Sequence, residues 1–331
     1  MPIVAGLGSP ASPGVRSEEE LTFRTYHGYV WAICTWTTDL YPHPGGLVPG
    51  VADAVRRGAW RTRTPPGRRS LPPRAQQFLR NGWATEVLLN SPRVIGGPDI
   101  IGFANHWASV QGYYAVFEAL NALALVVGTR LRTHEKMLAW AADQVGQAGS
   151  PFVVPWTTRV GGAPGAWTYE GFGGVRPASI SNLTSPTPMT APHLVGLALR
   201  TTRGRQIADH REQWLKLVPT VAKTPRRRLP KAELNARSSK LRATTLIDLL
   251  YRLRRRANYE EADAFLSGAL SVADAMAFHE ALTEVVAATL VTTEIYLAHL
   301  VGRPALEACA NALEVPAILA PHSVKTRMAL W

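Results

Sequence analysis

Two long segments in which apolar residues recur at helical spacing constrain the fold of this 331-residue chain more than any other feature. The first, residues 106–128, keeps its apolar side chains on one helical face and ends at Gly128, a residue suited to a helix C-cap. The second, residues 271–302, ends at a glycine with a proline shortly beyond it. Polar residues interrupt both before they reach the roughly 18 to 20 apolar residues of a membrane-spanning helix. The two segments predict buried helices of a mainly α protein with no membrane partner.

The rest of the chain alternates between helical patterns and stretches rich in glycine and proline. Thr133 is placed to cap a helix that Gly146 closes, which forms a helical hairpin with the helix before it. We expect three regions: an irregular, Trp-rich N-terminal region with Pro/Gly-rich loops at 1–104, a helical bundle at 105–302 interrupted by a long Gly/Pro-rich insertion at 149–193, and a C-terminal helical tail at 303–331.

Residues 246–263 form the segment most suggestive of a site. If the segment is helical throughout, four leucines make a stripe that must face the core: Leu246, Leu249, Leu250 and Leu253. Arg254 shares a helical column with Leu250 and Asn258, at the edge of that packed face. A permanent charge is costly there unless it is paired or used. The position fits hydrogen bonds that tie helices together, and it equally fits contact with a phosphate.

Two motifs stand in a fixed order along the helical part of the chain. The first is SVQGYYAVFEALNALALVVG, followed by the helix THEKMLAWAADQV, and the second is RLRRRANYEEADAF, before the last long helix. Together they resemble the HEPN superfamily of helical bundles, over about residues 105–145 and 240–302. The resemblance implies an HEPN-like bundle that forms homodimers. Tyr113 and Tyr114 of the first motif are expected to be packing residues.

The resemblance also bears on catalysis. HEPN ribonucleases carry an arginine and a histidine with four to six residues between them, but the places where the histidine would stand after Arg254 hold Tyr259 and two glutamates, at 260 and 261. Histidine titrates near neutrality, whereas tyrosine has a pKa of about 10 and is a poor base. The chain therefore resembles the branch of the superfamily without nuclease activity. The site residues that the resemblance implies are Arg254, Asn258, Tyr259 and His134.

Charge gives a second indication. The chain carries a net charge of +12, and residues 200–256 contain 17 Lys and Arg against 4 Asp and Glu. Concentrated positive charge next to aromatic residues favours nucleic-acid phosphates, although a solvated basic face is an equally good reading. The residues expected to bind nucleic acid are Arg226, Arg227, Arg228, Arg252, Arg255 and Arg256.

Several classes of site are disfavoured by the sequence. Cys34 and Cys309 are too few for a disulfide framework or a cysteine zinc site. His279 begins HEALTE, but the second histidine of a zinc-protease helix is replaced by Thr283. No P-loop or nucleophile-elbow motif is present, so we expect neither a metal nor another cofactor.

The sequence thus favours a non-catalytic protein that binds RNA through its basic segment, as a homodimer or with a protein partner. The first alternative is a divergent, metal-independent ribonuclease in which Arg254 stabilises the phosphorane and His134 or His279 supplies the base. The second is a structural or protein-partner role in a defence or toxin-antitoxin type system. The N-terminus shows no charged region followed by an apolar one, which leads us to expect a cytoplasmic protein.

Overall fold

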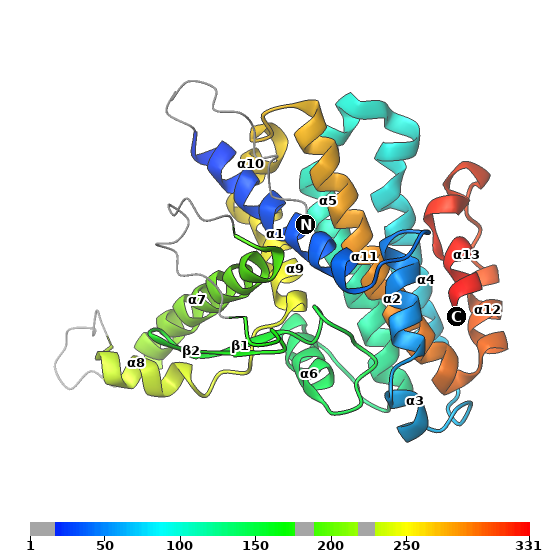
Figure 1. Cartoon of the computed structure of the whole chain (residues 1–331), viewed down its shortest axis with the longest axis horizontal. Coiled ribbons are helices and arrows are strands. Elements are labelled where there is room, and N and C mark those ends of the chain that lie inside the picture. The colour runs from blue at the N-terminus through cyan, green and yellow to red at the C-terminus, as the bar shows by residue number, and fades with distance from the viewer. Residues whose placement is uncertain (1–16, 176–188, 218–228) are drawn as a thin grey trace.

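The computed structural model describes residues 17–175, 189–217 and 229–331, and the fold is mainly helical, as predicted (Figure 1). The helices are α1 Glu18–Leu40, α2 Leu47–Arg56, α3 Trp60–Arg63, α4 Pro73–Ser91, α5 Gly97–Val126, α6 His134–Gly146, α7 Ala191–Leu217, α8 Lys231–Ser238, α9 Leu246–Arg255, α10 Ala262–Ser267, α11 Val272–Val301, α12 Arg303–Asn311 and α13 Val324–Arg327. Short π-helical turns lie at Pro92–Gly96 and Arg256–Glu260, and 3-10 turns at Ala317–His322 and Met328–Leu330. The strands β1 Arg159–Ala163 and β2 Ala166–Glu170 form one antiparallel hairpin, the only sheet among the described residues.

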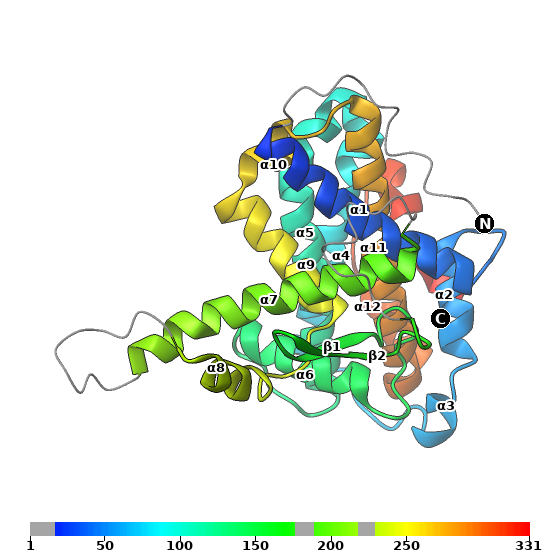
Figure 2. The ribbon, with the colours of Figure 1, turned by 60° about the vertical axis from the view of Figure 1, so that its left-hand side comes forward.

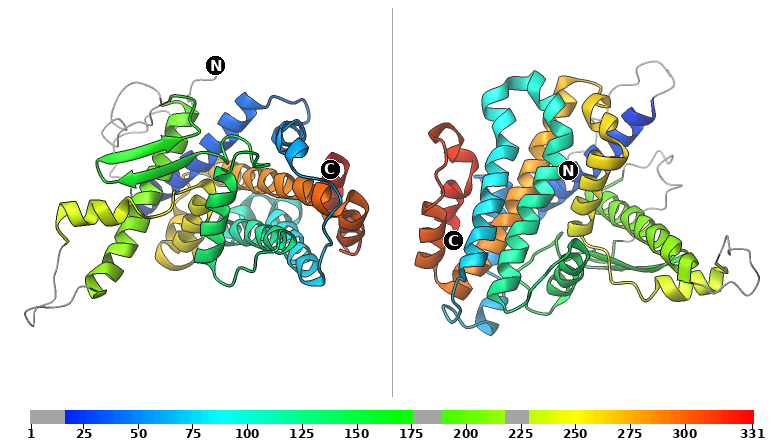
Figure 3. Two further views of the ribbon diagram at one scale, coloured as in Figure 1. Left: turned by 90° about the horizontal axis from the view of Figure 1, so that it is seen from below. Right: turned by 180° about the vertical axis from the view of Figure 1, so that it is seen from behind.

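The two long apolar segments form α5 and α11, which lie side by side at the centre of the bundle (Figure 1). Helices α4, α9 and α10 pack against α5, while α1 and α2 pack against α11. The connections α4–α5 and α10–α11 lie at the same end of the bundle (Figure 3). In the described part of the chain, α11 is the one helix long and apolar enough to cross a membrane, but 83% of its apolar window is buried inside the protein. It has the environment of a core helix.

The predicted helix ends are confirmed in detail. Thr133 accepts a hydrogen bond from the Lys136 backbone amide at 3.2 Å, so its hydroxyl caps α6. Gly128 (φ 90°) and Gly302 (φ 87°) follow the ends of α5 and α11 in the left-handed region, which glycine adopts without steric cost. These local signals fix the start of α6 and the ends of α5 and α11, but α5 begins at Gly97, nine residues before the predicted start at 106, so the expected boundary at 104/105 falls inside it.

The N-terminal region differs from the irregular segment expected for 1–104. From residue 18 onward it is largely helical, and its helices bury aromatic side chains such as Phe23, Trp60 and Trp83 in the common core. The Pro/Gly-rich stretches at 41–46 and 64–72 are loops, as expected, but Pro73 stands in the first turn of α4, where the missing amide hydrogen costs nothing. One of the prolines expected in a loop therefore begins a helix.

The insertion at 149–193 is a covering layer where the structure describes it, up to residue 175. Phe152, Trp156 and Phe172 bury their rings against the bundle, and Trp156 Nε1 donates a 2.8 Å hydrogen bond to Thr289 Oγ1 of α11. The β1–β2 hairpin lies beside α7, which extends away from the bundle together with α8 (Figure 2). Residues 176–188 lie outside the described part of the chain.

A buried arginine of α7 joins these outer elements. The Arg203 guanidinium donates to the backbone carbonyls of Gly162, Ser238, Leu241 and Arg242, and thereby ties the hairpin, α8 and the turn before α9 together. Burial, with the charge of Arg242 adding to it, lowers the pKa of Arg203 to about 10. Part of the positive charge of residues 200–256 is therefore used inside the protein to hold these elements together.

Candidate functional site

A π-helical turn interrupts the helix predicted for 246–263 and shapes the candidate site. The four-leucine stripe is buried as predicted, but α9 ends at Arg255 and the turn Arg256–Glu260 follows. The amide of Glu261 donates to the Arg256 carbonyl at 2.8 Å, five residues back. Because this turn is wider than an α-helical turn, the residue brought over Arg254 is Tyr259, five positions on, instead of Asn258.

Arg254 lies in a cage of four tyrosine rings. Its guanidinium carbon is 5.1 to 5.9 Å from the ring centroids of Tyr113, Tyr114, Tyr251 and Tyr259. Nη2 donates to Tyr114 Oη at 2.9 Å and to Tyr259 Oη at 3.5 Å. The faces of aromatic rings attract a cation, so the cage holds the charge in a nearly buried position where only 8% of Arg254 is exposed.

The same guanidinium has unused hydrogen-bonding capacity. Nε is buried without an acceptor, and Nη1 makes no hydrogen bond to any described residue. No carboxylate of the described residues forms an ion pair with Arg254. A buried arginine is ordinarily paired with a carboxylate, because an unpaired buried charge is costly. Among the described residues, Arg254 is therefore a nearly buried cation without an anionic partner.

His134 joins the same cluster from the start of α6. Its Nδ1 lies 2.8 Å from Tyr113 Oη, and its ring centroid is 4.5 Å from that of Phe117. It also stacks on Tyr251, which contacts Arg254 from the other side. Burial, and next the positive charge of Arg254, lower the pKa of His134, so the imidazole is neutral at pH 7.

The structure thus brings together three of the site residues predicted from sequence: Arg254, Tyr259 and His134. The fourth, Asn258, is half-buried in the π-helical turn and makes no hydrogen bond to a described residue. Tyr113 is a fully buried packing residue as expected, but it and Tyr114 also bind His134 and Arg254. Tyr251 was missed, although its spacing of three residues from Arg254 on a helix was a usable signal.

The α9 arginines predicted to bind nucleic acid are engaged within the protein. Arg255 pairs with Asp209 at 2.7 Å and with Glu260 at 2.9 Å, and Arg256 pairs with Glu260 and Glu261. Arg252 donates to the hydroxyls of Thr201 and Thr202 and lies over the Tyr26 ring. All three line a cavity of about 490 Å³ between α6, α7 and α9. Arg226, Arg227 and Arg228 lie outside the described residues.

His279, the second histidine considered as a base, lies elsewhere. It is fully buried on α11, where its Nδ1 is 3.2 Å from Asn105 Oδ1. Burial lowers the pKa of His279 to about 4. It makes no contact with Arg254, and the described residues contain no group of His, Cys, Asp and Glu side chains able to hold a metal ion.

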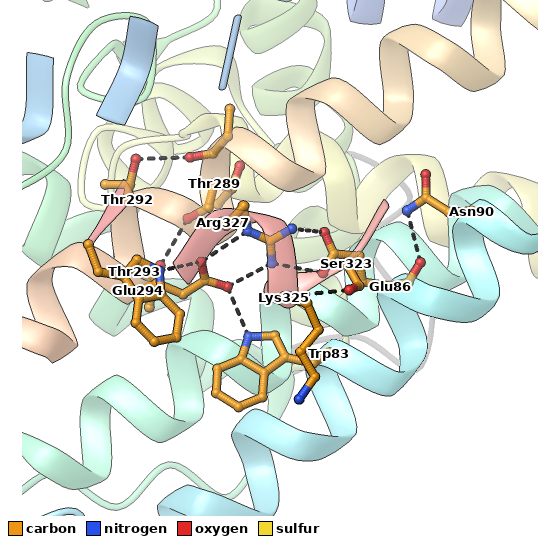
Figure 4. Close-up of polar contacts among 12 residues, drawn as sticks. Trp83, Glu86, Asn90, Thr289, Thr292, Thr293, Glu294, Ser323, Lys325 and Arg327 are labelled. Atoms are coloured by element: carbon orange, nitrogen blue, oxygen red, sulfur yellow. Dashed lines mark hydrogen bonds and ion pairs between the residues drawn. The ribbon is translucent and has the colours of Figure 1, made fainter. Parts of the chain in front are cut away.

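A second cluster of charged side chains lies between α4, α11 and α13 (Figure 4). Arg327 donates through all three guanidinium nitrogens to the carboxylates of Glu86 and Glu294, which are both buried. The indole groups of Trp83 and Trp331 donate to Glu294 as well. Burial raises the pKa of Glu86 although Arg327 opposes it. Because Arg327 and both indole groups donate to these buried carboxylates, the cluster holds the C-terminal segment against α4 and α11.

Glu118 is an isolated carboxyl on the same helix as Tyr114 and Phe117. It faces α4 at Gly82, and its Oε2 is buried without a partner among the described residues. Burial raises the pKa of Glu118 to about 7. It is the one acidic residue of α5 beyond the first turn.

Comparison of the chain with protein-family models, with curated proteins and with solved structures found no match. The geometry of the Arg254 cluster is consequently the basis on which a function is inferred.

Proposed function

We propose that the protein is a divergent HEPN-like bundle that binds single-stranded RNA at the Arg254 cluster without cleaving it. The observation that carries the proposal is the Arg254 guanidinium, held by four tyrosine rings with no carboxylate partner among the described residues. An oxygen of a phosphodiester supplies the acceptor that Nη1 lacks. The HEPN-like assignment rests on the resemblance of the two sequence motifs, which fall on α5–α6 and on α9 with the turn after it.

The exposed ring of the cluster favours a single strand over a duplex. Tyr259 is 71% exposed, and its hydroxyl contacts Arg254, so a phosphate and an adjacent base can be bound at one place. Unstacked bases bind aromatic side chains at about 1 to 3 kcal/mol each, whereas paired bases do not offer their faces. The site has no base-reading geometry, and we expect little sequence preference.

The geometry supports binding better than cleavage. Nδ1 of His134 already shares a hydrogen bond with the Tyr113 hydroxyl, and burial raises the pKa of Tyr113, which keeps that hydroxyl protonated. Ribonuclease activity stays the second candidate, because His134 is neutral at pH 7 and lies beside the cage of Arg254. It requires the other ring nitrogen to take the proton from the 2′-hydroxyl.

One experiment separates the two candidates. A labelled single-stranded RNA is incubated with the protein at low and moderate salt, and both the mobility shift and the cleavage are read from the same samples. For binding, Tyr259→Ala is expected to lower the affinity about tenfold, Tyr259→Phe to retain most of it, and Arg254→Ala to lose it with the RNA intact. Cleavage that disappears in Arg254→Ala and in His134→Ala establishes the ribonuclease, and an absence of any shift at low salt refutes the binding proposal.

An exposed apolar stripe on α5 supports self-association. Ile100, Phe103 and Trp107 follow helical spacing and are 48%, 69% and 53% exposed. Residues 100–117 contain no Asp, Glu, Lys or Arg, so two copies of this +12 chain can meet there without like-charge repulsion. We expect a homodimer by light scattering and a monomer for Phe103→Asp; a wild-type monomer at high concentration contradicts this.

A further inference from the structure

Three exposed arginines without an ion-pair partner among the described residues lie together in a place that charge counting along the sequence did not indicate. A cleft of about 490 Å³ lies between α4, the last turns of α5 and the α5–α6 loop, and its cations are Arg74, Arg130 and Arg132. All three are exposed, and none forms an ion pair with a described residue. No acidic side chain lines the cleft. We call this feature the α4–α5 cleft.

Aromatic and amide groups accompany these charges. The rings of Phe78 and Phe117 line the cleft and are half-buried, which leaves part of each face open. Arg74 lies over the Phe78 ring at 5.7 Å, so the guanidinium is held against the aromatic wall. A second concave surface of α4 adjoins the cleft at Arg74 and Phe78 and adds the cation Arg80. Interleaved arginine and phenylalanine side chains are typical of surfaces that follow a single-stranded backbone.

The cleft is continuous with the Arg254 cluster. Phe117 lines the cleft, and its ring centroid is also 4.5 Å from that of His134 and 6.2 Å from that of Tyr114. Tyr114 in turn accepts the hydrogen bond from Arg254. In the rear view of Figure 3, α4 and α5 stand side by side, and α6 lies beside the lower part of α5.

From these contacts we infer that the α4–α5 cleft binds the phosphodiester backbone of a single-stranded nucleic acid that continues past His134 to Arg254. This inference rests on the proposed RNA-binding function and places its main electrostatic contacts on Arg74, Arg130 and Arg132. A phosphate ligand needs cations whose charge is free. Arg255 and Arg256 share the carboxylates of residues 209, 260 and 261, whereas the three cleft arginines have no carboxylate partner among the described residues.

The test compares two triple variants that remove the same charge. The cleft variant is Arg74→Ala, Arg130→Ala and Arg132→Ala; the control variant is Arg57→Ala, Arg61→Ala and Arg211→Ala, three exposed arginines outside the cleft. Affinity for a short fluorescein-labelled oligouridylate is measured by anisotropy over a range of salt concentrations. Each phosphate contact on a single strand contributes about 0.7 to the slope of log affinity against log salt.

We expect the cleft variant to lose at least tenfold in affinity at moderate salt and to lower the steepness of the salt dependence by about 2, which is three contacts at about 0.7 each. The control variant should keep nearly the wild-type slope. If the cleft variant behaves like the control while Arg254→Ala loses binding, the cleft inference is overturned and the proposed function stands. If the wild type does not bind at low salt, both fail.

Photocrosslinking gives a readout that does not depend on affinity. A 4-thiouridine strand bound to the wild-type protein is irradiated, and the crosslinked peptides are identified by mass spectrometry. Crosslinks at Phe78 or Phe117 support the cleft. Crosslinks confined to α7 and α9 overturn it and place the strand in the cavity that Arg252 and Arg255 line.

Discussion

Replacement of Arg327 by methionine is expected to destabilise the protein through the carboxylates it leaves behind. Methionine keeps most of the buried hydrocarbon of the side chain, so the change chiefly removes charge and hydrogen bonds. In the wild type, Arg327 donates to both oxygens of Glu86 and to both oxygens of Glu294. Glu294 retains the indole donors of Trp83 and Trp331, but Glu86 loses every side-chain donor it has among the described residues.

The loss of stability in Arg327→Met depends mainly on Glu86, which keeps no side-chain donor among the described residues. Removing one partner of a buried ion pair costs about 3 to 5 kcal/mol, because a charge stays buried without compensation. Such a loss is a large fraction of a typical stability of about 5 to 15 kcal/mol. Burial already raises the pKa of Glu86 in the presence of Arg327, and without Arg327 the rise is larger. The folded variant then holds a proton that the unfolded chain releases, so its stability falls as pH rises above the unfolded pKa of Glu86.

Urea unfolding followed by tryptophan fluorescence measures the effect at pH 8 and at pH 5. We expect Arg327→Met to lose about 3 to 5 kcal/mol at pH 8 and distinctly less at pH 5, because the raised pKa of Glu86 favours its neutral form as the pH falls. Arg303→Met is the matched control, since Arg303 is half exposed, pairs with Glu307, and should cost at most about 1 kcal/mol. The double variant Glu86→Gln/Arg327→Met should recover part of the loss. Equal losses for Arg327→Met and Arg303→Met, or a loss that does not change with pH, would refute the reasoning.

Three further predictions concern individual residues. Burial raises the pKa of Glu118 to about 7, so the free energy of unfolding of the wild type falls as the pH rises from about 4.5 toward 7. In urea unfolding, Glu118→Gln should therefore be more stable than the wild type by about 1 to 2 kcal/mol at pH 8 and nearly equal to it at pH 5. Gly268→Ala should destabilise the protein by about 1 to 3 kcal/mol, because the added Cβ would stand 2.6 Å from the Glu19 carbonyl oxygen of α1. Gly102→Ala on α5 meets no atom within 4 Å and should stabilise the protein by about 0.5 to 1 kcal/mol. Thermal unfolding that ranks the two variants in the opposite order contradicts the packing argument. Leu250→Ala should cost about 2 to 5 kcal/mol in urea unfolding, and a cost below 1 kcal/mol would mean that the α9 stripe is not core.

The sequence predicted the central helices well because their signals are local. Apolar spacing, a threonine cap and terminal glycines act within one or two turns, and α5, α6 and α11 follow them closely. The N-terminal helices were missed because proline and glycine look the same at a helix start and in a loop. The insertion was read correctly as poor in helix, but the burial of Trp156 and Phe172 depends on contacts with distant segments that no local pattern encodes.

In the candidate site, too, the sequence predicts what local patterns encode and misses what depends on contacts between distant segments. Arg254 stands out in the sequence because a charge falls beside a leucine stripe, and His134 because it begins a capped helix. The exchange of Asn258 for Tyr259 could not be predicted, since a shift by one position requires the π-helical turn. Tyr113 and Tyr114 have the helical spacing of core residues. Their contact with the Arg254 guanidinium depends on the packing of α9 against α5, which the sequence pattern does not encode.

Charge is where sequence reasoning and structure diverge most, and the cause is physical. A count of lysines and arginines along residues 200–256 measures how much positive charge is present, whereas a phosphate responds to the charge left after internal pairing. In that segment Arg203 binds carbonyls, and Arg242, Arg255 and Arg256 bind carboxylates. Three arginines of two ordinary-looking segments, α4 and the α5–α6 loop, have no such partner among the described residues. These three arginines are thus distinguished by the absence of a described acidic residue around them, which only the folded chain reveals.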